Sequence, residues 1–287
     1  MLKNYLDNIS NNNISTYVSR DREDIIIEFL INNFEIEKTC IEVGASDGIS
    51  QSNTLNIRNN YGFTSLLIEP PGDSYDKLIK LANEKTHIEC CYINHKGTNT
   101  IDSISSKFFN KIGVLSLDID GNELEIFENM AVRPQIVVIE YNNQFPPHID
   151  YQDPPNCKYF RHSAKAISRI GHNKNYTTIY VTNDNVILLD NELKNDKFED
   201  LFIEKPIEIL SNYYNLENKK YFGLILTCKQ YTNRHIFIFK PNILLRIYAK
   251  ILDLFAFIRS LKKRKFYLKY DLNENLKINI KNSKLYF

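Results

Sequence analysis

Short apolar runs alternate with helix-like patterns along the first two thirds of the chain. The runs are rich in Ile, Val and Leu and end at Gly, Pro or charged residues, as buried strands do. They predict strands at residues 39–43, 65–69, 87–92, 112–118 and 135–141. Helical spacing between and after them predicts helices at residues 21–34, 74–83, 102–110, 122–130 and 163–174. Apolar strands alternating with helices are typical of parallel βαβ units covered on both faces.

Two local features complete this prediction. Asp21 is placed to cap the first helix, whose buried face would carry Ile25, Phe29 and Leu30. Near the end of the alternating region, residues 177–182 and 186–189 flank Asn183-Asp184-Asn185 and predict an antiparallel hairpin. The predicted fold class is therefore α/β: a Rossmann-like, doubly wound sheet that ends in an antiparallel hairpin.

The pattern also divides the chain into two parts. Residues 1–190 are expected to form one domain with its core at residues 38–190, and residues 191–287 a C-terminal extension. Two further strands are predicted in the extension, at residues 221–227 and 235–239.

An amphipathic basic helix is predicted at residues 241–265, ending in Lys262-Lys263-Arg264-Lys265. Its charged positions argue against a membrane-spanning helix. Two interpretations stay open. The helix packs on the core or on a partner, or it makes peripheral contact with an anionic membrane surface.

Composition narrows the class of protein. With 43% hydrophobic and 25% charged residues, the chain is typical of a soluble globular protein. Its 36 Lys and Arg nearly balance 35 Asp and Glu, so we expect no nucleic-acid partner. The polar N-terminus lacks an apolar targeting segment, which predicts a cytoplasmic location, and the five cysteines have no zinc-binding spacing.

The first candidate site lies in the loop after the first strand. Residues 42–48 read Glu-Val-Gly-Ala-Ser-Asp-Gly, at the sheet edge where doubly wound folds bind ligands. Glycines let the backbone approach a ligand there, although their spacing does not meet the dinucleotide fingerprint. Glu69 ends the next strand and can accept two hydrogen bonds from ribose hydroxyls. Together the loop and Glu69 indicate nucleoside binding.

The second candidate site is a group of carboxylates at the next strand ends. Asp118 and Asp120 lie two residues apart, which would place them on one side of the pleat, and Glu140 ends the neighbouring strand. These three residues are the candidate ligands of a Mg²⁺ ion that would polarise a substrate hydroxyl. Alternatively, one Asp acts as a general base. Asp120 would also be explained as a helix cap, with Glu123 completing a capping box.

These motifs together resemble one known family. Residues 42–48, Glu69, Thr100-Ile101-Asp102 and residues 118–127 are similar to the FkbM-like family of S-adenosylmethionine-dependent methyltransferases, over about residues 38–190. The resemblance implies the class I methyltransferase fold, with a seven-stranded sheet whose last strand is antiparallel. It also implies methylation of oxygen on a small-molecule or glycan acceptor, such as a sugar or a surface-polysaccharide precursor.

The resemblance further implies roles for single residues. Glu42, Gly44 and Gly48 would line the methionine part of the cofactor, Glu69 would hold its ribose, and Asp118 would lie nearest the transferring methyl group. The full implied cofactor set is Glu42, Gly44, Ala45, Ser46, Asp47, Gly48, Glu69, Pro70 and Asp118.

Two departures from the family pattern concern this set. The first motif begins with Glu42 instead of Asp, and Asp118-Ile119-Asp120-Gly121 replaces a commoner Asp-x-Glu-Gly, which leaves the metal question open. The candidates for taking the acceptor's proton are Asp118, His148 and His162. A surface position is the alternative explanation for each histidine.

Two other functions stay open from the residues alone. One is a nucleotide-dependent oxidoreductase, which would use the same nucleoside site. The other is a methyltransferase-like scaffold without activity, held at a membrane assembly by residues 241–265.

Overall fold

A seven-stranded sheet forms the centre of the fold in the computed structural model, which describes residues 17–143, 145, 150–153, 161–210, 224–227 and 236–239. The sheet order is β3-β2-β1-β4-β5-β7-β6. The strands are β1 (Thr39–Val43), β2 (Thr64–Glu69), β3 (Thr86–Cys90), β4 (Val114–Leu117), β5 (Ile136–Glu140), β6 (Tyr176–Val181) and β7 (Asn185–Asp190).

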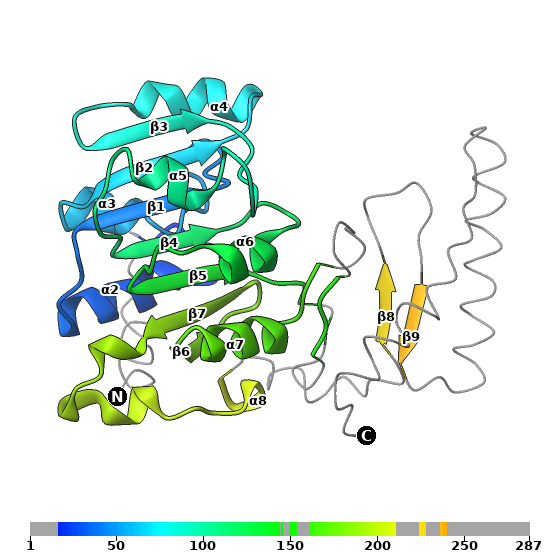
Figure 1. The fold of residues 1–287 in the computed structure, drawn as a ribbon. Helices are drawn as coiled ribbons and strands as arrows, with labels where there is room; N and C mark the ends of the chain where they lie inside the picture. The colour runs from blue at the N-terminus through cyan, green and yellow to red at the C-terminus, as the bar shows by residue number, and fades with distance from the viewer. Residues whose placement is uncertain are drawn as a thin grey trace, which may run out of the picture.

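Strand directions confirm the predicted fold class. β1 to β5 pair in parallel, whereas β7 is antiparallel to both of its neighbours, β5 and β6 (Figure 1). The α/β sheet with its C-terminal antiparallel hairpin is therefore the class I methyltransferase fold. The parallel strands end at the same edge, which brings the loops after β1, β2, β4 and β5 together.

Side chains that alternate along each strand divide the core between two faces. Leu115 and Leu117 of β4 pack on one face, and Val114 on the other. The first face is covered by α5 (Ile101–Ser105), α6 (Glu123–Asn129) and α7 (Ala164–Asn173), which face the viewer in Figure 1. The second face is covered by α2 (Glu23–Asn33) and α3 (Leu55–Asn60). A sheet covered on both faces explains why its central strands are apolar throughout.

The first helix differs from the prediction at its start. α2 begins at Glu23, and its N-cap is Arg22 with φ 70°, whose side chain makes no capping hydrogen bond, so the predicted Asp21 cap is wrong. Glu23 is fully buried because its carboxylate binds the backbone N–H of Asp21 and the side chains of Thr182 and Asn185. The predicted buried face is confirmed.

Other helices are shorter than predicted or were missed. The predicted helix 74–83 divides into α4 (Asp73–Leu78) and the 3₁₀ turn η1 (Ile79–Leu81). α5 ends at Ser105, five residues before the predicted end at residue 110. α3 was not predicted because its six residues, LNIRNN, hold only two aliphatic positions.

Packing continues beyond the predicted domain boundary at Asp190. Two 3₁₀ segments, η2 (Asn191–Leu193) and η3 (Asp196–Phe202), are followed by α8 (Ile207–Leu210). Phe198 of η3 is buried against Phe34, with ring centroids 4.9 Å apart. Residues 191–210 thus share the hydrophobic core of the sheet.

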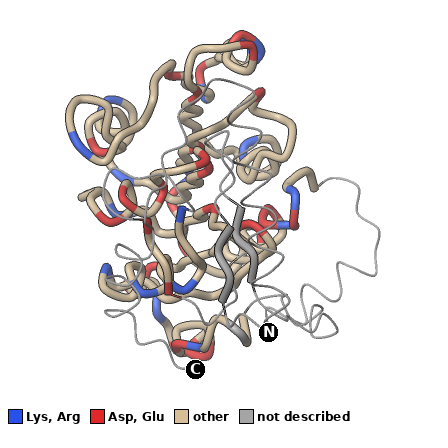
Figure 2. The backbone as a smooth tube through the Cα atoms, turned by 90° about the vertical axis from the view of Figure 1, so that its right-hand side faces the viewer, with Lys and Arg blue, Asp and Glu red and all other residues tan. Residues whose placement is uncertain are grey.

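Two strands of the C-terminal extension are described. β8 (Leu224–Thr227) and β9 (Ile236–Phe239) lie within the two predicted strand ranges, and they pair antiparallel. Residues 1–16 and the predicted helix 241–265 lie outside the described residues. Within the described part, no helix combines the length and apolar character needed to cross a membrane. Acidic and basic residues interleave along the described chain (Figure 2).

Candidate functional site

The edge formed by the carboxyl ends of β1, β2, β4 and β5 carries the candidate site. Among the described residues of its loops, four that are not glycine adopt a positive φ, which is uncommon and costly for L-residues. They are Ser46 (51°), Gln51 (59°), Asp120 (56°) and Arg161 (64°). Such strain tends to cluster where a binding or catalytic site needs an unusual backbone.

The turn after β1 requires both of its predicted glycines. Gly44 has φ 80°, and the backbone N–H groups of Gly44 and Ala45 donate to the Ile68 carbonyl over 2.9 and 3.1 Å. A Cβ at Gly44 would lie 1.7 Å from the Asp118 carbonyl oxygen, so β4 approaches this turn too closely for any side chain. Gly48 has φ 74° and faces Leu78. The glycines therefore set the shape of the turn and its contact with β4.

Glu69 lies beside this turn, as predicted. Its Oε2 accepts the backbone N–H of Ser46 over 2.9 Å. Burial raises the pKa of the Glu69 carboxyl, and the hydrogen bond from Ser46 opposes that rise. Pro70 follows it and is half-buried. A strand-end carboxylate next to a glycine turn is a suitable acceptor for two ribose hydroxyls.

Asp47 is occupied by its own loop. Its carboxylate accepts the N–H groups of Ile49 and Ser50 over 2.9 and 2.7 Å, and these bonds lower the pKa of Asp47. Local bonds of this kind fix a turn. Asp47 thus keeps the loop in shape while remaining partly exposed at the edge of the site.

Glu42 is placed beneath the loop rather than at its surface. The residue is 5% exposed, and its carboxylate accepts the Ser52 and Thr54 hydroxyls over 2.7 and 2.6 Å and the Asn53 N–H over 2.9 Å. These bonds anchor the segment that follows the glycine turn. In the structure, Glu42 supports the site through residues 52–54.

Asp118 and Glu140 form a carboxyl pair where β4 and β5 end. Asp118 as a whole residue is exposed, but its carboxyl group is partly desolvated, and this desolvation raises its pKa to about 6. A hydrogen bond from Glu140 opposes the rise, whereas the charges of Glu123 and Asp120 add to it. Burial and the charge of Asp118 also raise the pKa of Glu140. Two neighbouring carboxyl groups disfavour double ionisation, so the pair tends to hold a shared proton.

Arg161 supplies the positive charge at this edge. Its Nη1 pairs with the Glu140 carboxylate and lies 3.3 Å from Asp120 Oδ1. Its backbone N–H donates to Asp153 Oδ2 over 2.9 Å, which fixes the backbone at Arg161. The guanidinium therefore stands between two of the three predicted metal ligands.

The predicted geometry of Asp120 is wrong. β4 ends at Leu117, and Asp120 follows in a left-handed turn with its side chain 92% exposed, so the pleat does not align it with Asp118. Asp120 does not cap α6 either, because that helix starts at Glu123 after Asn122. The backbone of the turn is held by Glu123 Oε1, which accepts the N–H groups of Ile119 and Gly121.

The magnesium hypothesis gains no support from this arrangement. Across the described residues, no group of three or more His, Cys, Asp or Glu side chains is placed to hold a metal ion. Instead, Arg161 neutralises Glu140 and approaches Asp120, while Asp118 binds Glu140.

His162 lies behind Glu140 rather than in the open site. It is 2% exposed, with Nε2 2.8 Å from the Glu140 carbonyl oxygen and 3.8 Å from Glu123 Oε2. Burial lowers the pKa of His162 and favours the neutral ring. A buried neutral ring in this place positions the end of β5. His148, the other candidate histidine, lies outside the described residues.

Sequence reasoning missed Arg161 and the role of Glu123 at this site. Arg161 pairs with Glu140 and Asp120, which lie 21 and 41 positions earlier in the chain, so no local sequence pattern predicts these contacts. Glu123 carried a weak signal as a capping-box candidate, and the structure uses it to hold the turn before the helix.

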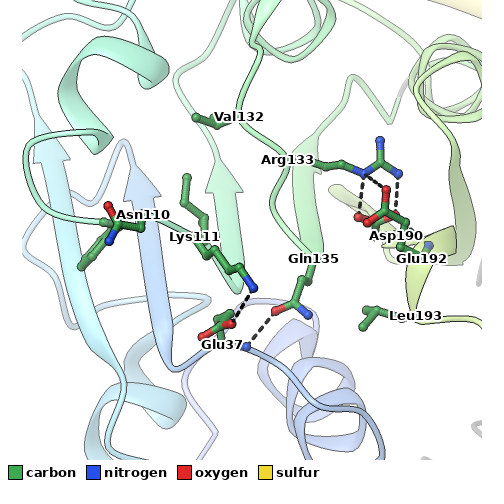
Figure 3. Close-up of a pocket in the computed structure, with 11 residues that line it drawn as sticks. Glu37, Asn110, Lys111, Val132, Arg133, Gln135, Asp190, Glu192 and Leu193 are labelled. Atoms are coloured by element: carbon green, nitrogen blue, oxygen red, sulfur yellow. Dashed lines mark hydrogen bonds and ion pairs between the residues drawn. The ribbon is translucent and has the colours of Figure 1, made fainter.

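A separate pocket of about 300 Å³ lies near the opposite edge of the sheet (Figure 3). Its polar groups bind one another: Arg133 pairs with Asp190, Lys111 lies 3.5 Å from Glu37, and Gln135 accepts the Glu37 N–H. Because these polar groups already pair with one another, we interpret them as stabilising the fold rather than as binding a ligand.

No protein-family model matches the chain, and no curated protein matches it. Solved structures do. An O-methyltransferase from Bacillus cereus in complex with SAH is 14% identical, over 65% of this chain and 88% of that chain, with a TM-score of 0.41. The N-terminal domain of EvdMO1 with SAH bound is 8% identical, over 60% and 82%, with a TM-score of 0.40.

A SAM-dependent methyltransferase from Aquifex aeolicus is also similar, with 12% identity, 63% of this chain and 95% of that chain covered, and a TM-score of 0.36. These structural neighbours are thus methyltransferases.

Proposed function

We propose that this chain is an S-adenosylmethionine-dependent methyltransferase that methylates a hydroxyl oxygen of a sugar, glycan or surface-polysaccharide precursor, as the resemblance to the FkbM-like family implies. The observation that carries the proposal is the left-handed turn at Gly44, packed between Glu69 and Asp118 at adjoining strand ends. The sugar class of the acceptor rests on the resemblance alone.

The residues present fit the cofactor by their chemistry. Glu69 offers carboxylate oxygens for the ribose hydroxyls, and the backbone of Gly44 to Gly48 offers a surface free of large side chains for the methionine part. Carboxylates also suit a positively charged ligand. When bound, the cofactor supplies a methyl group already activated on a sulfonium.

The chain itself must orient the acceptor and remove its proton. Asp118 is the best-placed group for the second task, since a carboxyl group with a pKa of about 6 is largely ionised at neutral pH and still basic enough to accept a proton. Glu140 and Arg161 hold its surroundings in place.

Removing the Glu69 carboxylate tests the cofactor site. Glu69→Ala is expected to weaken S-adenosylhomocysteine binding by roughly tenfold or more, because hydrogen bonds to a charged group contribute about 1.5–3 kcal/mol. Titration calorimetry measures the change.

Glu69→Gln separates two roles of this side chain. The amide oxygen can still accept the Ser46 N–H, so the turn stays anchored while the charge on the ribose side is lost. We expect an intermediate affinity. If the folded wild-type protein gives no heat with S-adenosylhomocysteine and binds NAD tightly instead, a nucleotide-dependent oxidoreductase replaces the proposal.

A further inference from the structure

The candidate site holds more acidic than basic side chains. Asp118, Asp120, Glu123 and Glu140 lie around the ends of β4 and β5, and among the described residues Arg161 is the cation paired with them. Glu123 is fully buried, and its Oε2 has no hydrogen-bond partner. Even with one proton shared between Asp118 and Glu140, the group carries net negative charge.

This negative group adjoins the turn that would hold the cofactor. The Asp118 N–H donates to the Val43 carbonyl over 3.0 Å, and the Asp118 carbonyl oxygen lies where a Cβ of Gly44 would stand. Arg161 approaches the same strand ends, where its Nη1 pairs with Glu140 and lies 3.3 Å from Asp120 Oδ1. A ligand above the turn at Gly44 would therefore lie beside Asp118, with Arg161 among the neighbouring carboxylates.

We propose that Asp118 makes this site selective for ligand charge, so that S-adenosylmethionine binds more tightly than S-adenosylhomocysteine, and that Arg161 limits this selectivity. The inference rests on the proposed function. Methyl transfer breaks the S–CH₃ bond, returns its electron pair to sulfur and forms an O–CH₃ bond, while the acceptor's proton leaves to a base or to solvent. The sulfonium charge is thereby lost, and with it the attraction to Asp118.

The two residues act with opposite sign. Asp118 attracts the sulfonium, whereas Arg161 repels it, and partial desolvation strengthens both effects relative to bulk water. Tighter binding of the charged substrate than of the neutral product favours exchange of product for substrate after each turnover. Asp118 is thus a specificity-determining residue for the charge of the ligand.

Calorimetric titration of the full chain with each of the two compounds tests this inference. The measured quantity is the ratio of the two dissociation constants in wild type, Asp118→Asn and Arg161→Gln. We expect wild type to favour S-adenosylmethionine, Asp118→Asn to reduce that preference by roughly three- to tenfold, and Arg161→Gln to increase it. Glu37→Gln, at the opposite edge, is the matched control and should leave the ratio unchanged.

Each variant is first shown to be folded by its unfolding transition, because a damaged fold weakens both ligands together and leaves their ratio intact. If Arg161→Gln does not fold, Asp118→Asn decides alone, and Arg161→Lys, which keeps the charge, should retain the wild-type ratio. Equal binding of both ligands by wild type, or an unchanged ratio in Asp118→Asn, overturns the inference and leaves the proposed function standing. Failure of the folded wild type to bind either ligand overturns both.

Discussion

Replacing Gly44 by alanine is expected to destabilise the protein by about 3 kcal/mol or more and to abolish S-adenosylhomocysteine binding. Two costs combine: a left-handed φ of 80° penalises any Cβ by about 1–2 kcal/mol, and the new atom would lie 1.7 Å from the Asp118 carbonyl oxygen. The turn must therefore move away from β4, and this movement changes the positions of Glu69 and Asp118 relative to each other. Denaturant unfolding and titration calorimetry measure the two effects.

Gly62→Ala is the matched control for this experiment. Gly62 has a similar φ of 72°, but a Cβ there would meet nothing within 4 Å. It should cost only about 1–2 kcal/mol, which is the cost of the backbone conformation alone. If Gly44→Ala costs no more than Gly62→Ala and still binds the ligand, the close approach of Asp118 to the turn is not what fixes the site.

The sequence was sufficient to predict the sheet because its strands are buried on both faces. A run such as Ile136–Glu140 is apolar without a break until the charged residue at the sheet edge, and helical spacing marks the crossovers between strands. The parallel topology then brings the strand ends together, which is why the turn at Gly44 and the carboxylate of Glu69 were correctly predicted to be neighbours.

What the sequence did not predict depends on contacts between distant parts of the chain. The pairing of Arg161 with Glu140 and Asp120 depends on where the segment after the proline-rich loop returns to the sheet. The orientation of Asp120 depends on β4 ending at Leu117 and on one left-handed residue, neither of which periodicity reveals. Glu42 matched a cofactor motif, yet its buried carboxylate binds residues 52–54.

These differences change the chemistry expected at the site. With three aligned carboxylates, the edge would attract a hard cation. With Arg161 between Glu140 and Asp120, it already contains a positive charge, and Asp118 is the one of the three predicted ligands whose backbone contacts the turn at Gly44. The structure therefore favours acid–base and electrostatic roles for this group of residues.

Replacing Arg133 by methionine is expected to lower the free energy of unfolding by about 3 kcal/mol without changing S-adenosylhomocysteine affinity. Arg133 binds both carboxylate oxygens of Asp190, whose side chain is 4% exposed (Figure 3). It also donates to the carbonyl oxygens of Lys174 and Asn175. Methionine fills similar space but leaves a buried carboxylate without its countercharge, a change that typically costs about 3–5 kcal/mol. The lower end applies because Arg133 is 34% exposed.

Lys111→Met is the control from the same pocket. Lys111 and Glu37 form an ion pair at 3.5 Å, but their side chains are 77% and 46% exposed, so its loss should cost less than about 1 kcal/mol. Adding Asp190→Asn to Arg133→Met removes the unpaired charge and should restore part of the lost stability. Equal losses of unfolding free energy for Arg133→Met and Lys111→Met in urea would contradict the prediction. The burial of Asp190 would then add nothing to the cost of removing its partner.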